Sequence, residues 1–194
     1  MKPKVSVYIA TSLDGFIARK NGALDWLNGG DEQGAEDYGY QEFMDSVDVL
    51  VVGRKTFEKA LTFGEWPYRG KKVVVLSTGA PSIPGSLHDS VTVLSSSPKD
   101  LVEHLSSQGA THLYIDGGIT IQHFIAAGLV DEMIITRIPI LIGDGVPLFG
   151  PLNDDVKLTH IATRQFDNGY VQSKYRFTKN ASQVILANGL KRSR

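Results

Sequence analysis

Apolar residues in this chain come in short runs that are separated by glycine, proline and polar residues. Runs of this length are typical of strands that are covered on both faces of a sheet. They predict strands at residues 5–10, 49–52, 72–76, 91–94, 111–115 and 131–138. The alternation within residues 5–10 is too weak to expose one face, so we expect this strand in the middle of a sheet.

Segments with helical spacing lie between several of these runs. They predict helices at residues 37–46, 54–63, 97–107 and 118–129. Near the end of the chain, residues 156–166 and 170–177 flank Asp167-Asn-Gly169, which is typical of a hairpin turn. Alternating strands and helices followed by a hairpin predict an α/β fold with a largely parallel sheet and an antiparallel edge.

The chain is organised around the stretch in which the strand at residues 49–52 runs into Gly53 and a helix then begins. Arg54, Lys55 and Thr56 fall in the first turn of that helix, where unpaired backbone N–H groups and the helix dipole attract an anion. Arginine and lysine beside such amides suit a phosphate group. The stretch therefore predicts a binding site for nucleotide phosphates.

A second stretch of the same kind follows the strand at residues 111–115. It runs into Gly117-Gly118, after which Ile121 and Phe124 recur at helical spacing. We call each of these strand–glycine–helix connections a corner: the first comprises residues 53–56 and the second residues 117–120. One corner means little by itself, because many α/β connections have this form. Two of them can bind two parts of one ligand.

Two loops and one strand end carry further candidate residues. Asp14 and the glycine after it predict a turn behind the first strand, where α/β proteins often bind their ligands. Residues 19–36 form a long irregular segment, in which Trp26 either anchors the loop to the core or covers a bound ring. Ser77 and Thr78 end another strand, where small hydroxyl residues either form a turn or contact phosphate.

The composition limits the classes of partner. The 194 residues are 42% hydrophobic, which is enough for one core, and we expect one domain at residues 1–177 and an extension at 178–194. The 20 basic and 21 acidic residues give a net charge of −1, which favours neither nucleic acid nor an anionic membrane as a partner.

Targeting and metal signals are weak in this sequence. No apolar run approaches the roughly 18 residues of a membrane helix, and the N-terminus does not resemble a secretory signal. The absence of cysteine excludes disulfides and thiolate chemistry and is compatible with a cytoplasmic protein. The five histidines show no ligand-like pairing, so we expect no metal site.

Several motifs together resemble a known family. Val-Val-Gly53-Arg-Lys-Thr56-Phe-Glu, Val-Leu76-Ser77-Thr78 and Ile-Asp-Gly117-Gly118 resemble, in order and spacing, the NADPH-binding segments of dihydrofolate reductase. Three others are more similar to the reductase domain of the bacterial riboflavin-biosynthesis deaminase-reductase: Thr11-Ser-Leu-Asp14-Gly15-Phe-Ile-Ala, Leu129-Val-Asp-Glu132 and Pro139-Ile-Leu-Ile-Gly143-Asp-Gly145. The resemblance covers about residues 4–177.

This resemblance implies a dihydrofolate-reductase-like three-layer α/β fold, with a mostly parallel mixed sheet and a C-terminal antiparallel hairpin. It also implies hydride transfer from NADPH and a homodimer. By the family pattern, residues 53–56 hold the cofactor phosphates, and Ser77 and Thr78 lie near the adenosine 2′-phosphate. The second corner, formed by Gly117, Gly118, Ile119 and Thr120, approaches the pyrophosphate and the nicotinamide half, and Ala10 lies at the nicotinamide face.

The substrate side follows the family pattern less closely. Asp14 matches the substrate-side aspartate of the riboflavin reductases. Trp26 is the candidate residue for covering a bound substrate ring. These enzymes usually carry glutamate where this chain has Asp116, which is shorter by one methylene, so substrate contact there is an open expectation. Dihydrofolate reductases place an acid on the helix before the central corner. Glu36 or Asp37 lies near that helix start and Asp25 further away, so the sequence does not select one proton donor.

The leading hypothesis is an NADPH-dependent reductase of a C=N or C=O group on a small heterocyclic or sugar-linked substrate, similar to 5-amino-6-(5-phosphoribosylamino)uracil reductase. One alternative is a non-catalytic NADP(H)-binding regulatory protein, and another is a divergent dihydrofolate reductase. Lys71 disfavours the latter, because folate enzymes use an arginine there and lysine lacks its bidentate fork. The glycine spacing of P-loop hydrolases and of ordinary dinucleotide-binding dehydrogenases is absent.

Overall fold

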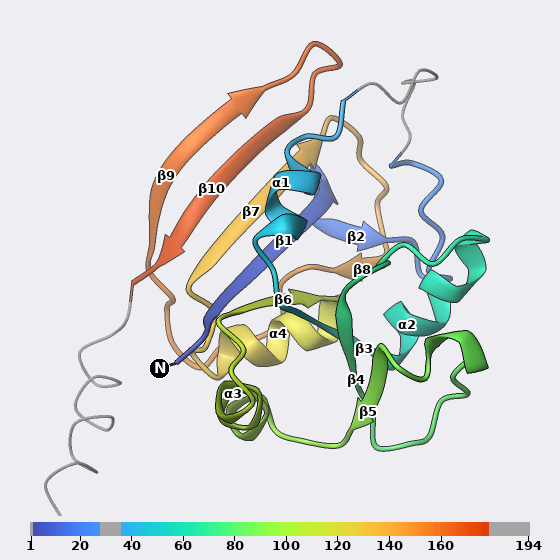
Figure 1. The fold of residues 1–194 in the computed structure, drawn as a ribbon. Helices are drawn as coiled ribbons and strands as arrows, with labels where there is room; N and C mark the ends of the chain where they lie inside the picture. The colour runs from blue at the N-terminus through green and yellow to red at the C-terminus, as the bar shows by residue number, and fades with distance from the viewer. Residues whose placement is uncertain (1, 28–35, 179–194) are drawn as a thin grey trace, which may run out of the picture.

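A computed structural model of the chain describes residues 2–27 and 36–178. Its main sheet has eight strands in the order β5-β4-β3-β6-β1-β7-β10-β9 (Figure 1). Six of them run parallel, and β10 and β9 are antiparallel at one edge. The strands are β1 (Lys4–Ser12), β3 (Val49–Gly53), β4 (Lys72–Leu76), β5 (Val91–Leu94), β6 (His112–Asp116), β7 (Glu132–Ile138), β9 (Leu158–Gln165) and β10 (Val171–Phe177).

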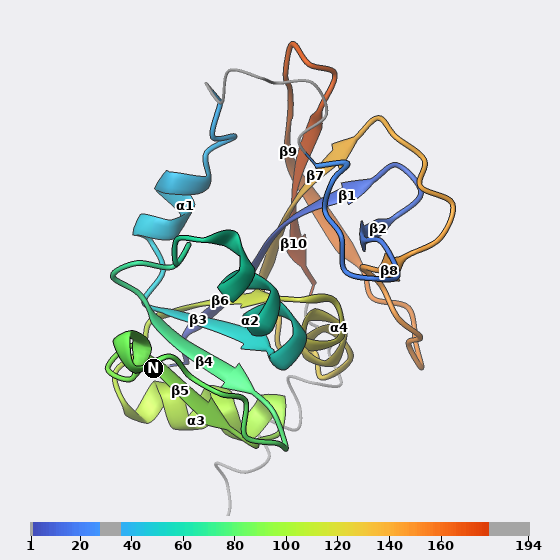
Figure 2. The same cartoon turned by 90° about the vertical axis from the view of Figure 1, so that its right-hand side faces the viewer.

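Helices cover both faces of this sheet and make three layers (Figures 1 and 2). One face packs against α1 (Tyr40–Asp45) and α2 (Arg54–Ala60), and the other against α3 (Pro98–Ser107) and α4 (Gly118–Ala126). Two single turns of 3-10 helix, η1 (Leu61–Phe63) and η2 (Gly85–Leu87), lie in the connections. The predicted α/β fold, with its largely parallel sheet and C-terminal hairpin, is confirmed.

The apolar runs explain why the inner strands are buried on both faces. In β3, Val49 and Val51 pack into the core below α3 and α4, whereas Leu50 and Val52 pack into the core below α1 and α2. Successive side chains of a strand point to opposite faces, so an uninterrupted apolar run satisfies two cores at once. This pattern fixes β3 and its neighbours in the interior of the sheet.

The topology brings the two predicted corners together. Strand β3 pairs in parallel with β6, and Val52 lies opposite Asp116 in that register. Both strands therefore end at the same edge of the sheet, with Gly53 and Gly117 as the next positions. Ligands of open α/β sheets bind at this carboxyl edge.

Some predicted boundaries are wrong. The predicted helix at residues 37–46 begins at Tyr40, because Tyr38 and Gly39 have φ values of 57° and 84°, which a right-handed helix does not allow. The predicted turn at Asp14-Gly15 is present, but β1 continues beyond residue 10 to Ser12, and β2 (Phe16–Ala18) pairs with β8 (Val146–Pro147). Helix α4 ends at Ala126, short of the predicted residue 129.

The helix at residues 97–107 is confirmed, and its start shows the expected cap. Ser97 Oγ accepts a hydrogen bond from the Asp100 backbone at 3.2 Å, and Pro98 takes the first helical position. The proposed extension after residue 177 lies outside the described residues, apart from Thr178. Within the described part of the chain, the helices are too short to span a membrane.

Candidate functional site

The two corners after β3 and β6 interlock through glycine and threonine. A Cβ atom at Gly53 would lie 2.8 Å from Thr120 Oγ1 of the other corner. A Cβ atom at Gly117, where φ is 92°, would collide with Thr56 Oγ1. Each helix start is therefore seated on a glycine of the opposite strand, and both starts face one shared region at the sheet edge.

The first turns of α2 and α4 keep their backbone donors free of side-chain caps. No side chain accepts a hydrogen bond at the cap residue of either helix, in contrast to Ser97 at the start of α3. The unpaired N–H groups and positive dipole ends of two adjacent helices attract an anion. The arrangement can hold the two phosphates of a dinucleotide.

Arg54 links the first corner to the end of β4. Its Nε donates to Glu58 Oε1 at 2.6 Å, and a Cβ atom at Gly79 would lie 3.4 Å from its NH1. In the turn after β4, Ser77 Oγ accepts from the Gly79 backbone at 3.1 Å. Arg54 and the Ser77–Thr78 pair thus share one exposed region, whereas Lys55 is exposed without a partner among the described contacts.

The second corner divides its residues between packing and exposure. Thr120 is buried against Gly53, and Gly118 is closely surrounded by Ile17 and Val146 of the small β2–β8 sheet. Ile119 is 61% exposed beside them. Of the residues in this turn, Ile119 therefore offers its side chain to a ligand, and the others offer backbone.

Asp14 holds two loops together. Its Oδ1 accepts from Ser12 Oγ at 2.5 Å, and its Oδ2 accepts from the Gly143 backbone at 2.8 Å. These hydrogen bonds lower the pKa of Asp14, the Ser12 contact most strongly. The carboxylate fastens the turn after β1 to the loop that contains Gly143.

The two predicted proton donors are exposed and engaged elsewhere. Asp25 forms an ion pair with Arg19 at 2.8 Å, and hydrogen bonding to that arginine lowers its pKa. Asp37 accepts from the backbone of Gly39 and Gln41, and these bonds lower its pKa as well. A lowered pKa keeps both groups ionised near neutral pH, which is unfavourable for an acid that must donate a proton.

Trp26 lies at the carboxyl ends of β1 and β7. It is 3% exposed and packs with Ile138 and Tyr170, and Ala10 lies against the same cluster. This packing agrees with the interpretation of Trp26 as a loop anchor. Among the described residues, its buried Nε1 has no hydrogen-bond partner.

Asp116 is the carboxylate with an unusual environment. Burial raises its pKa to about 6, although the Gly117 backbone donates to its Oδ1 at 2.7 Å. The Tyr68 hydroxyl lies 3.5 Å from its Oδ2, and the charge of Asp116 adds to the burial that raises the pKa of Tyr68. The sequence analysis predicted Asp116 only as a substrate contact. It did not identify Tyr68, which lies 48 positions away in the chain.

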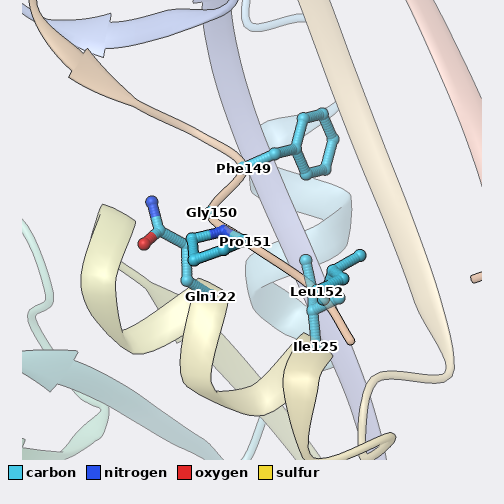
Figure 3. Close-up of a pocket in the computed structure, with 6 residues that line it drawn as sticks. All are labelled: Gln122, Ile125, Phe149, Gly150, Pro151 and Leu152. Atoms are coloured by element: carbon cyan, nitrogen blue, oxygen red, sulfur yellow. The ribbon is translucent and has the colours of Figure 1, made fainter. Parts of the chain in front are cut away.

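A small hollow beyond the second corner offers no ligand site. It lies between α4 and residues 149–152 and has a volume of about 10 Å³ (Figure 3). Gln122 Nε2 donates to the Pro147 carbonyl at 2.9 Å, and a Cβ atom at Gly150 would lie 2.7 Å from Gln122 Oε1. These contacts fasten the segment after β8 onto α4 and thereby support the second corner.

The donors and the close glycines fit a phosphorylated dinucleotide. Backbone amides of two helix starts, Arg54, and the hydroxyls of Ser77 and Thr78 lie along the carboxyl ends of three neighbouring strands, β4, β3 and β6. NADPH carries a pyrophosphate and a 2′-phosphate, which need two such donor sets. The residues present are therefore suited to hold NADPH.

Comparisons with known proteins agree with this fold. The family model for the RibD C-terminal domain matches residues 3–172. YwjB of Bacillus subtilis (strain 168), an uncharacterised protein, is 37% identical over 169 residues, which are 86% of this chain and 94% of YwjB.

Two solved structures extend the comparison. The crystal structure of a candidate riboflavin biosynthesis protein from Shewanella sp. PV-4 matches with a TM-score of 0.86 and 41% identity, over 91% of this chain and 99% of that one. Dihydrofolate reductase from Enterococcus faecalis, solved with NADP(H), matches with a TM-score of 0.64 and 14% identity, over 92% and 99% of the two chains. The second likeness shows a common fold.

Proposed function

Because the chain belongs to the family of the RibD C-terminal domain, we propose that it is an NADPH-dependent reductase. It would transfer a hydride to a C=N or C=O group of a small heterocyclic or sugar-linked substrate, similar to 5-amino-6-(5-phosphoribosylamino)uracil reductase. The observation that carries the proposal is the interlocked pair of corners at Gly53 and Gly117, which joins two uncapped helix starts at one sheet edge.

In this proposal the protein binds, orients and shields the reactants. NADPH supplies the hydride, and the chain positions it against the acceptor carbon. Arg54, Ser77 and Thr78 hold the 2′-phosphate, and residues 53–56 and 117–120 hold the pyrophosphate. Ala10, which the nicotinamide ring would face, packs against the cluster that contains Trp26.

We propose Asp116 as the group that supplies the proton. With a pKa of about 6, roughly a tenth of the Asp116 side chains are protonated at pH 7. Asp25 and Asp37 have lowered pKa values and carry ion-pair or backbone contacts of their own, and Asp14 fastens two loops. In this assignment Asp14 keeps an indirect role, since it holds the turn beside Ala10 in place.

A folate substrate is disfavoured by the position of Lys71. Its Nζ donates to the Val47 carbonyl at 2.9 Å, directly after α1. The side chain therefore supports the end of that helix and does not reproduce the arginine that binds the carboxylate of folate.

We also propose that the protein is a cytoplasmic homodimer. All eight residues of the edge strand β9 are exposed, including the apolar side chains of Leu158 and Ile161. An edge strand with open backbone groups and apolar side chains pairs readily with another chain. A second copy of the same chain can satisfy both features with one symmetric contact.

Two measurements test the reductase proposal. Titration with NADPH should change the protein fluorescence and saturate at one site per chain. Addition of 5-amino-6-(5-phosphoribosylamino)uracil should then oxidise NADPH, which is followed by its absorbance. Saturable binding without oxidation of any riboflavin-pathway, pterin or carbonyl substrate would favour the regulatory alternative, and the absence of NADPH binding would overturn the proposal.

A further inference from the structure

A second cavity lies on the α1 face of the sheet, away from the two corners. We call it the α1 groove. It has a volume of about 310 Å³, and its lining residues come from α1 and the loop before it and from β1, β6, β7, β9 and β10. Lys4, His112 and Glu132 line it at the amino ends of their strands, whereas the corners follow the carboxyl ends. Its volume is within the range of pockets that hold small ligands.

A network of hydrogen bonds lies at the end of the α1 groove that is farthest from Lys4. Gln172 Nε2 lies within hydrogen-bond distance of three acceptors: Tyr8 Oη at 3.0 Å, Thr136 Oγ1 at 3.0 Å and the Tyr38 carbonyl at 3.1 Å. Tyr8 Oη donates to the same carbonyl at 2.7 Å. Neither Trp26 nor Ala10 lines the groove, and Tyr38 lies between the groove and their cluster, because it lines the first and packs against the second.

Positive charge prevails around the α1 groove. The carboxylate of Glu132 is 14% exposed and lies 2.6 Å from Lys4 Nζ, 3.3 Å from Lys174 Nζ and 3.7 Å from Arg176. Arg164 and Glu42 also line the groove, so its lining contains three cations and two carboxylates. Glu132 is shared by three cations, so Lys4 and Lys174 keep N–H donors from which a bound anion can accept hydrogen bonds.

The remaining walls of the groove are uncharged. His112 is buried, and both of its ring nitrogens are engaged: Nδ1 lies 2.8 Å from the Ser46 carbonyl and Nε2 2.8 Å from Ser6 Oγ. Burial lowers the pKa of His112, which keeps it neutral. Phe43 and Ile134 supply an apolar wall at the centre of the groove. The lining thus combines one cationic end with an apolar middle.

We propose that the α1 groove is a binding site for a small organic anion and is separate from the cofactor region. The carboxylate or phosphate group of the ligand binds between Lys4 and Lys174, and its apolar part lies against Phe43 and Ile134. The inference does not depend on the reductase activity, because none of these residues belongs to the two corners.

Phenyl phosphate is a suitable probe, and calorimetric titration measures its binding. We expect saturable binding to the full chain, with at least a tenfold loss of affinity in the double variant Lys4→Gln/Lys174→Gln. Lys174→Arg keeps the charge and should retain the affinity, as should Lys99→Gln on α3 of the opposite face. Far-ultraviolet circular dichroism checks that each variant is folded.

Arg54→Ala and saturating NADPH separate the groove from the corners. Neither should alter the affinity for phenyl phosphate if the probe occupies the α1 groove. A loss of binding in Arg54→Ala, or displacement by NADPH, would place the probe at the corners and overturn the proposal. It would also be overturned if the full chain bound no phenyl phosphate at millimolar concentrations, or if the double variant bound it as the unchanged protein does.

Discussion

Arg54 is the residue on which discrimination between the two nicotinamide coenzymes depends. Its guanidinium lies beside the turn of Ser77 and Gly79, where the resemblance places the 2′-phosphate that NADPH has and NADH lacks. The ion pair with Glu58 orients the Arg54 side chain. Because both groups are exposed, this pair contributes little to the stability of the protein. A phosphate in this place would gain a charge-assisted hydrogen bond.

Replacement of Arg54 by alanine should therefore weaken NADPH binding about tenfold or more, since hydrogen bonds to charged groups contribute about 1.5–3 kcal/mol. The affinity for NADH should change little. Fluorescence titration with both coenzymes measures the two effects, and Arg69→Ala, which removes an exposed arginine paired with Glu65, is the matched control. Equal losses for NADPH and NADH would contradict the assignment of Arg54 to the 2′-phosphate.

Asp116 should make stability depend on pH in the direction opposite to that of most carboxylates. Its folded-state pKa of about 6 lies above the ordinary value of 3.8, so the folded protein binds this proton more tightly than the unfolded chain does. The contribution of Asp116 is fully present below pH 3.8 and is lost as the pH rises through 6. The difference corresponds to roughly 3 kcal/mol at most.

The variant Asp116→Asn removes this titration and nearly keeps the shape of the side chain. Relative to the unchanged protein, it should gain stability as the pH rises from 4 to 7, as measured by urea unfolding at each pH. The same variant should lower the rate of NADPH oxidation if Asp116 supplies the proton. A stability difference that does not vary with pH would show that the pKa of Asp116 is not raised.

At the scale of elements, the two corners depend on close contact between helix starts and strand ends. Gly117 serves two needs at once: its φ of 92° favours glycine, and its missing side chain makes room for Thr56. Gly109 has a similar φ of 88°, but no atom lies within 4 Å of a Cβ atom placed there. Substitutions at Gly109 and Gly117 can therefore be compared to distinguish the cost of the left-handed backbone from the cost of disturbing the contact between the corners.

We expect Gly109→Ala to lower the free energy of unfolding by about 1–2 kcal/mol, through the left-handed conformation alone. Gly117→Ala should cost about 1–3 kcal/mol more, because Thr56 must move, and it should also weaken NADPH binding. Urea unfolding and fluorescence titration give the two quantities. Equal costs, with NADPH binding unchanged in both variants, would mean that the corners are not coupled.

Most elements could be predicted from the sequence because their signals are local. The apolar run of β3, the hairpin turn at Asp167-Asn-Gly169 and the Ser97 cap all act through neighbouring residues. The start of α1 and the pairing of β2 with β8 were missed. The first depends on the left-handed backbone at Tyr38, and the second joins segments that are about 130 positions apart.

In the candidate site, too, features with a local sequence pattern could be predicted, and features that depend on long-range contacts could not. The glycines of both corners and the basic residues of the first could be found from strand–glycine–helix patterns. The seating of Thr56 on Gly117, the contact of Tyr68 with Asp116 and the fastening of Asp14 to Gly143 are long-range contacts of single side chains. Periodicity contains no information about such contacts. The effect of burial on the pKa of Asp116 could not be predicted for the same reason.

At the scale of the whole molecule, the two edge strands of the main sheet, β5 and β9, differ in burial. Strand β5 has one buried, two half-buried and one exposed residue, whereas every residue of β9 is exposed. The open strand carries Leu158 and Ile161, which are apolar. Association through β9 would remove both apolar side chains from water.

We therefore expect sedimentation equilibrium to give twice the chain mass of 21.2 kDa. The variant Ile161→Lys should shift the mass towards that of the single chain, because a charge would be buried in the contact. Ile119→Lys, which alters an exposed apolar residue of the second corner, is the control and should leave the mass unchanged. A single chain mass for the unchanged protein would contradict the proposed dimer.

The central claim is that two corners at the ends of β3 and β6 bind one NADPH molecule together. A crystal structure of the protein grown with NADPH tests it most directly. We predict the pyrophosphate against the backbone of residues 53–56 and 117–120, the 2′-phosphate beside Arg54 and Ser77, and the nicotinamide ring facing Ala10. A cofactor bound elsewhere, or one that contacts only one of the two corners, would contradict the account.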